Sequence, residues 1–98
     1  MDLWDYVAYI KRGSTRKKVF LSLDKPMLPS EVVRKVFKNN GKRSSNTQFN
    51  LVSRALAELN ERGLADILNP NEKTGRLYEK TELGRKVEKE LSKLETQS

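Results

Sequence analysis

The sequence predicts a mostly helical α+β domain in which one short β-hairpin separates the last helix from four others. Two observations predict this fold class. In five segments, apolar residues recur every three or four positions, as they do on the buried face of a helix. Before the last of these segments, two short apolar runs flank a stretch dense in turn-forming residues. The 98 residues suffice for one domain with a modest core.

The first two predicted helices are short and follow each other directly. Residues 2–10 carry apolar side chains at helical spacing behind Asp2, which suits an N-cap, and a Lys-Arg-Gly run ends this helix at Gly13. The Trp and Tyr residues of this helix are expected to pack against the core or a second subunit; an aromatic platform for bases is the alternative. Ser14 is the predicted cap of the second helix, whose buried edge comprises Val19, Phe20 and Leu23.

A third helix is predicted after a break that contains two prolines. Pro26 ends the second helix because it has no N–H to donate, whereas Pro29 suits the first turn of the next helix. Residues 30–37 then form an apolar side of Val32, Val33, Val36 and Phe37. The run KNNGKR at 38–43 is predicted to be a turn, since Asn and Gly tolerate positive φ.

The chain is organised around the longest predicted helix, at about residues 46–62. Short polar side chains that can satisfy free N–H groups precede or open it: Ser44, Ser45, Asn46 and Thr47. The stripe expected to face the core comprises Phe49, Val52, Leu56 and Leu59, with Ala55 beside it. The opposite, polar face carries Thr47, Asn50, Arg54 and Glu61. Gly63 is the predicted C-cap.

The remaining residues predict a hairpin and a last helix. Residues 64–68 and 76–80 read as two short strands around the turn-rich loop 69–75. Thr81 is the predicted cap of a helix that ends at about residue 95. Its apolar stripe comprises Leu83, Val87, Leu91 and Leu94.

The net charge of +7 is concentrated in the first half of the chain. From Lys11 to Arg54, twelve Lys or Arg residues face two acidic ones, a local net charge of +10, whereas residues 81–98 are balanced. Such asymmetry predicts a polyanionic partner, because neutralised phosphates release their condensed counterions. A basic surface that only aids solubility is the alternative.

Other functions are disfavoured by composition. The chain has no cysteine and no histidine, so we expect no disulfide, no metal site, no cofactor and no enzyme activity. No apolar run is long enough to span a membrane, and the acidic N-terminal segment lacks the basic start of a secretion signal. We therefore expect a cytoplasmic protein.

Three stretches carry a resemblance to a known family: LPSEVV at 28–33, NLVSRALAELNERGL at 50–64, and GRLY with TELG at 75–84. Together they resemble the archaeal and bacterial winged helix-turn-helix transcriptional regulators of the ArsR/MarR-like type. The resemblance implies one winged-helix domain over 1–98: a helical extension at 1–12, the helix-turn-helix and wing at 14–80, and a C-terminal helix at 81–95. The recognition helix would be at about 46–62 and the two-stranded wing at about 64–80.

One departure from this family is the turn. Between the two helices of the motif, residues 38–48 exceed the usual compact turn by about nine residues. Either the preceding helix runs longer, or the turn is an enlarged basic loop, or the central helix begins early, at Ser45. The additional residues are expected to reach the phosphate backbone of DNA, or alternatively to form a surface insertion without contacts.

The resemblance implies that the recognition helix enters a DNA major groove. Asn50 and Gln48 would then contact adenine, Arg54 guanine or phosphate, and Thr47 and Ser53 base edges or phosphates. Lys73 and Arg76 would lie along the backbone or in a minor groove. The expected phosphate contacts are Lys17, Lys18, Lys42 and Arg43. Each residue has a structural alternative, such as capping for Asn and Gln or an ion pair of Arg54 with Glu58.

The sequence therefore predicts a regulator of transcription that binds double-stranded DNA sequence-specifically. A winged-helix module that docks on proteins of a transcription or repair assembly is the alternative, and RNA binding is a third possibility. A homodimer through the terminal helices is also expected, because the apolar residues there exceed what so small a core needs: Trp4, Tyr6, Ile10 and the Leu83–Leu94 stripe.

Overall fold

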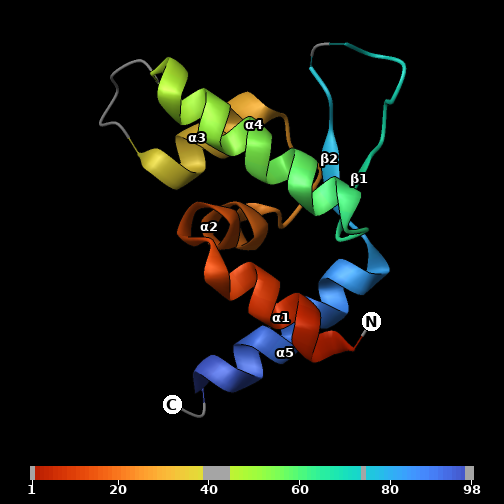
Figure 1. Cartoon of the computed structure of the whole chain (residues 1–98). Coiled ribbons are helices and arrows are strands. Elements are labelled where there is room, and N and C mark those ends of the chain that lie inside the picture. Colours follow the sequence, from red (N-terminus) through yellow and green to blue (C-terminus); the bar gives the residue numbers. More distant parts are fainter. Residues whose placement is uncertain (1, 39–44, 74, 97–98) are drawn as a thin grey trace.

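A computed structural model describes residues 2–38, 45–73 and 75–96 of the chain. Within these residues the helices are α1 (Leu3–Arg12), α2 (Ser14–Ser22), α3 (Pro29–Phe37), α4 (Asn46–Glu61) and α5 (Glu82–Thr96). The strands are β1 (Ala65–Ile67) and β2 (Tyr78–Lys80), which form an antiparallel hairpin between α4 and α5. The prediction of a mostly helical α+β fold with one hairpin is confirmed (Figure 1).

Side-chain caps fix where the long helices begin. The Ser45 hydroxyl accepts a hydrogen bond from the Gln48 N–H at 3.1 Å, and the Gln48 side-chain oxygen accepts one from the Ser45 N–H at 3.2 Å. This reciprocal capping box starts α4. Thr81 caps α5 as predicted, since its hydroxyl accepts from the Gly84 N–H at 3.0 Å. The prediction for α2 is wrong by one residue: Ser14 is already helical, and Gly13 occupies the cap position.

Gly63 follows α4 one residue later than predicted, because the C-cap is Arg62. Its φ of +73° lies in the left-handed region that favours glycine. This conformation turns the chain so that the Leu64 N–H donates to the Leu59 carbonyl at 2.9 Å. The chain therefore passes directly from α4 into the hairpin.

The hairpin is tied to the helices at its base. β1 and β2 pair with Ala65 opposite Lys80 and Ile67 opposite Tyr78. Tyr78 also exchanges both backbone hydrogen bonds with Met27, at 2.9 and 3.0 Å, and Met27 lies in the link between α2 and α3. Because of this bridge, the base of the hairpin has a fixed position relative to α3.

One hydrophobic core joins all these elements. α4 packs on both α2 and α3, and α1 packs on both α2 and α5. The largest fully buried side chains are Phe20, Ile10, Leu23, Leu56, Leu59, Leu64 and Leu91. α1 and α5 lie together at one end of the molecule, near both chain termini, while the hairpin loop and the start of α4 lie at the other end (Figure 1).

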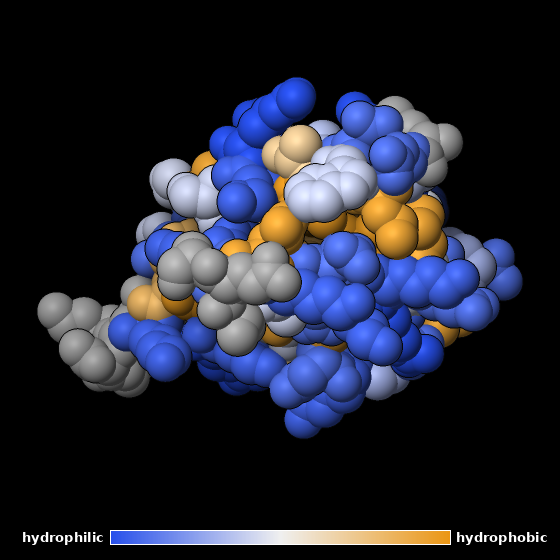
Figure 2. All heavy atoms as spheres, turned by 90° about the horizontal axis from the view of Figure 1, so that it is seen from below, coloured by the Kyte–Doolittle hydropathy of each residue, from blue (hydrophilic) through white to orange (hydrophobic). Residues whose placement is uncertain are grey.

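The end formed by α1 and α5 buries most of the apolar residues on which the dimer prediction depended. Ile10, Val87 and Leu91 belong to the core, and Leu83 and Leu94 pack against it. Trp4 remains 57% exposed. Seen from this side, hydrophobic atoms form a narrow seam bordered by hydrophilic ones (Figure 2).

Candidate nucleic-acid interface

The outward face of α4 is polar and exposed. Val52, Leu56 and Leu59 are fully buried on the inner face, which positions the helix firmly on α2 and α3. The 3.6-residue period then directs Thr47, Asn50 and Arg54 to solvent, where all three are exposed. A hydroxyl, an amide and a guanidinium group are thus presented in succession along one helix face.

Arg54 does not pair with Glu58, the partner that sequence spacing allowed. The Glu58 carboxylate accepts hydrogen bonds from the Arg16 guanidinium at 2.8 Å and from the Tyr9 hydroxyl at 3.1 Å. Among the described residues, Arg54 has no ion-pair partner. Its charge is therefore available to a ligand.

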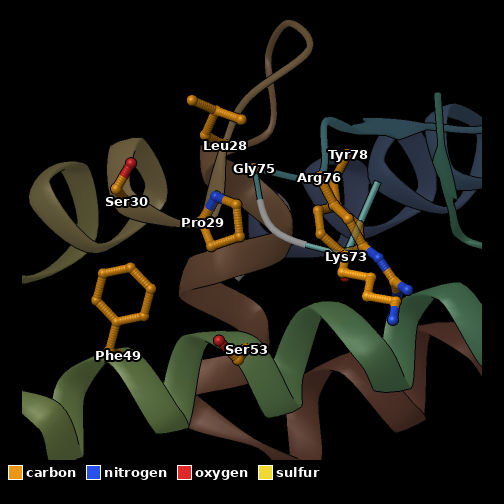
Figure 3. A pocket seen from close by; sticks show the side chains of 9 residues that line it. All are labelled: Leu28, Pro29, Ser30, Phe49, Ser53, Lys73, Gly75, Arg76 and Tyr78. Atoms are coloured by element: carbon orange, nitrogen blue, oxygen red, sulfur yellow. The ribbon is translucent and has the colours of Figure 1, made fainter. Parts of the chain in front are cut away.

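A cleft of about 430 Å³ separates α4 from the hairpin loop. α4 contributes Phe49 and Ser53 to it, and the hairpin contributes Lys73 and Arg76. The start of α3 and the hairpin complete the lining with Leu28, Pro29, Ser30, Gly75 and Tyr78. In Figure 3 the Lys73 and Arg76 side chains extend from the hairpin toward α4. Two cationic side chains and three hydroxyl-bearing ones (Ser30, Ser53 and Tyr78) therefore line a partly apolar cleft.

The loop that carries these cations is fastened by its own side chains. The Asn69 side chain donates to the Gly75 carbonyl at 3.0 Å and accepts from the Leu77 N–H at 2.7 Å. The Arg76 Nε donates to the Glu72 carbonyl at 2.9 Å. One edge of the Arg76 guanidinium thus holds the loop, while the side chain lines the cleft.

A smaller recess of about 190 Å³ lies on the other flank of α4. The start of α2, from Gly13 to Arg16, forms one wall, and α4 forms the other with Leu51, Arg54, Ala55 and Glu58. The outward face of α4 is therefore bordered by a hollow on each side.

The prediction that Phe49 belongs to the buried stripe is wrong. Phe49 is 39% exposed and lines the cleft, and Leu51, on the other flank of the helix, is 40% exposed. The reason is position: Phe49 lies in the first turn of α4, which extends past the core that buries Val52, Leu56 and Leu59.

The other predicted site residues have different surroundings. Gln48 contributes its side-chain oxygen to the capping box. Lys17 forms an ion pair with Glu95 of α5, so its charge is directed away from α4. Lys18 is exposed on α2, and Ser53 is exposed on α4. Lys42 and Arg43, with most of the long turn, lie outside the described residues.

The start of α3 also belongs to this site, although no sequence signal indicated it. Leu28, Pro29 and Ser30 line the cleft because the bridge between Met27 and Tyr78 brings this segment next to the hairpin. The proline in the first helical turn signalled only where the helix begins. Nothing in the local sequence indicated a pairing with a residue fifty positions away.

Comparison of the chain with protein families, with curated proteins and with solved structures finds no match. None of the described helices combines the length and the apolar content needed to cross a bilayer. The site must accordingly be interpreted from its own chemistry.

Proposed function

We propose that this protein is a sequence-specific double-stranded DNA-binding regulator of transcription with a winged-helix fold. α4 is its recognition helix and the hairpin is its wing. One observation carries the proposal: the outward face of α4 presents Asn50 and Arg54, which has no ion-pair partner in the described part of the chain, and two hairpin cations line a cleft along the same helix. A recognition helix in the major groove needs this combination of base-edge contacts and phosphate contacts.

The contacts follow from the chemistry of each group. The Asn50 amide suits the paired donor and acceptor of adenine, and the Arg54 guanidinium suits the two acceptors of guanine or a phosphate. Lys73 and Arg76 neutralise the phosphates of one strand. Thr47 and Ser53 supply hydroxyl groups to base edges or phosphates. Gln48 acts first as a cap, and Lys17 is left out because Glu95 holds it.

The local electrostatics favour an anionic partner. Glu58 is the acidic side chain bordering the recess that contains Arg54, and Arg16 already neutralises it. The residues that line the larger cleft include two cations and no acid. A phosphate backbone on either flank of α4 therefore meets little repulsion.

A two-fold symmetric dimer remains part of this proposal. Trp4 is 57% exposed and belongs to α1. α1 lies at the end of the molecule away from the hairpin loop and the start of α4 (Figure 1). A second copy packed there would leave both recognition helices exposed. Its operator would have two half-sites about one helical turn apart.

A protein-docking module is the second candidate, and the same exposed Trp4 favours it. Tryptophan is enriched at the centres of protein interfaces. A docking module would show no salt-sensitive affinity for duplex DNA, whereas a regulator must show it.

Selection of bound sequences from a random duplex pool tests the proposal. We expect an enriched motif, and we expect duplex RNA of the same sequence to compete poorly, because its deep, narrow major groove excludes the helix. Absence of enrichment would contradict sequence-specific binding. Equal competition by duplex RNA would contradict insertion of α4 into a major groove.

A further inference from the structure

Two large apolar side chains flank the polar face of α4 at the end where it stands clear of the core. Phe49 is 39% exposed and Leu51 is 40% exposed, although both lie within one turn of the buried Val52. Helix geometry places these two residues about 200° apart, on opposite flanks of the face that carries Asn50. Both side chains are therefore accessible to a ligand that covers this face of the helix.

Each of these side chains lines the same hollow as a basic side chain. Phe49 lines the cleft whose other wall carries Lys73 and Arg76, and its ring points into that cleft (Figure 3). Leu51 lines the recess that also contains Arg54. An apolar group and a cation therefore occur together on both flanks of the helix.

This arrangement matches one feature of the DNA major groove. The thymine methyl group is the apolar feature of that groove. It is attached to C5, which lies nearer to the backbone of its own strand than the hydrogen-bonding O4 does. A side chain that reaches this methyl group must therefore lie at the flank of a recognition helix, next to the groups that bind the phosphates. The centre of the helix face contacts the hydrogen-bonding edges instead.

We propose that Phe49 and Leu51 read thymine methyl groups, one on each strand of the duplex. The inference rests on the proposed function, since it assigns specificity to the same interface. Phe49 contacts thymine on the strand whose phosphates meet the hairpin cations, and Leu51 contacts thymine on the other strand. Polar contacts through Asn50 and Arg54 are thereby supplemented by apolar contacts that require the C5 methyl group.

Uracil replacement tests this proposal, because it removes the methyl group and leaves every hydrogen-bonding group in place. The probe is the duplex obtained by selection, with all thymines of one strand, then of the other, replaced by uracil. For the unaltered full chain, we expect the Kd to rise about fourfold for each contacted thymine that is replaced by uracil. This factor is equivalent to the burial of one methyl-sized group.

Two variants assign the two strands. Phe49→Ala is expected to abolish the thymine preference on one strand only, and Leu51→Ala on the other strand only. Leu21→Ala is the matched control, because Leu21 is also 39% exposed but belongs to α2; it should keep both preferences. Thermal unfolding of each variant checks that it folds, and both α4 side chains are exposed enough for truncation to leave the core intact.

The possible outcomes separate this inference from the proposed function. Equal affinity of the unaltered chain for thymine and uracil duplexes, or a preference that survives in both α4 variants, would overturn methyl readout while DNA binding stands. A selected motif without thymine on either strand would do the same. Failure to bind any duplex would overturn the proposed function and the inference together.

Discussion

The guanidinium group of Arg16 lies 2.8 Å from the carboxylate of Glu58, and this ion pair joins α2 to α4. Tyr9 of α1 completes the junction, because its hydroxyl donates to the same carboxylate at 3.1 Å. The guanidinium groups of Arg16 and Arg62 both lie over its ring, 3.8 and 4.3 Å from the centroid. One partly buried polar cluster thus sets the position of α4 relative to α1 and α2.

Breaking this junction should destabilise the fold. We expect Arg16→Met to lower the free energy of unfolding by about 1–3 kcal/mol, because it leaves a partly buried carboxylate without its charged donor. A double-mutant cycle with Glu58→Gln, followed by chemical denaturation, measures the coupling. Asp24→Asn removes the charge of the exposed pair with Lys35 and should cost less than about 1 kcal/mol. Equal effects of both substitutions would contradict a special role for the junction.

The Tyr9 phenol should make stability depend on alkaline pH. Burial raises its pKa above the ordinary 10.0, and the hydrogen bond to Glu58 raises it further, although the charge of Arg16 opposes the shift. The stabilisation from the neutral phenol is therefore fully present below pH 10.0 and is lost as pH rises through the folded-state pKa. Between about pH 8 and 11, the free energy of unfolding should fall less with rising pH in Tyr9→Phe than in the unaltered chain. An equal dependence of unfolding free energy on pH in the two proteins would contradict the raised pKa of Tyr9.

Gly84 is required where α5 passes the hairpin. A Cβ atom at this position would lie 2.3 Å from the Leu64 carbonyl oxygen, so Gly84→Ala must move the helix. We expect a loss of about 1–3 kcal/mol in unfolding free energy, as for other overpacked sites. Lys89→Ala, at an exposed position of the same helix, is the control and should stay within about 0.5 kcal/mol of the unaltered chain. An unchanged melting temperature for Gly84→Ala would contradict the expected clash between the added Cβ atom and the Leu64 carbonyl.

Arg54 should be the most informative single residue for DNA binding. We expect Arg54→Ala to weaken binding to the selected duplex by about 1–3 kcal/mol, the range for a lost base contact. Gel shifts measure the change. Arg85→Ala removes the same charge from α5, where the side chain is 65% exposed, and controls for net charge. Unchanged affinity of Arg54→Ala would remove this residue from the interface.

The hairpin cations should bind phosphates rather than base edges. We expect Lys73→Ala to weaken binding similarly for selected and unrelated duplexes and to reduce the salt slope of log K by about 1. Arg76→Ala should have a larger effect, since its Nε also holds the loop through the Glu72 carbonyl. Titrations at several salt concentrations provide the slopes. A loss confined to the selected duplex would instead indicate base contacts from the hairpin.

Local patterns predicted the elements well. Apolar periodicity located all five described helices, and the residues Gly63 and Thr81 marked helix ends that the structure confirms. These signals act over a few residues, so the sequence reveals them directly. The hairpin was predictable for the same reason, from turn formers between two short apolar runs.

The site was less predictable because its parts meet through long-range contacts. Phe49 follows the helical period of the core, yet the core ends before its turn, and no local pattern reveals where a core ends. The partner of Glu58 is Arg16, forty-two positions earlier, rather than the nearby Arg54. Lys17 pairs with Glu95 across the fold for the same reason. Each of these differences changes which charges remain available to a ligand.

Nuclear magnetic resonance of the full chain, titrated with the selected duplex, tests the central claim most directly. We predict that the largest amide shifts fall on the first half of α4, on the hairpin loop at 72–77 and at the start of α3, whereas α1 and α5 change little. Shifts concentrated on α1 and α5 around Trp4, with α4 unaffected, would contradict the claim that the outward face of α4 binds DNA.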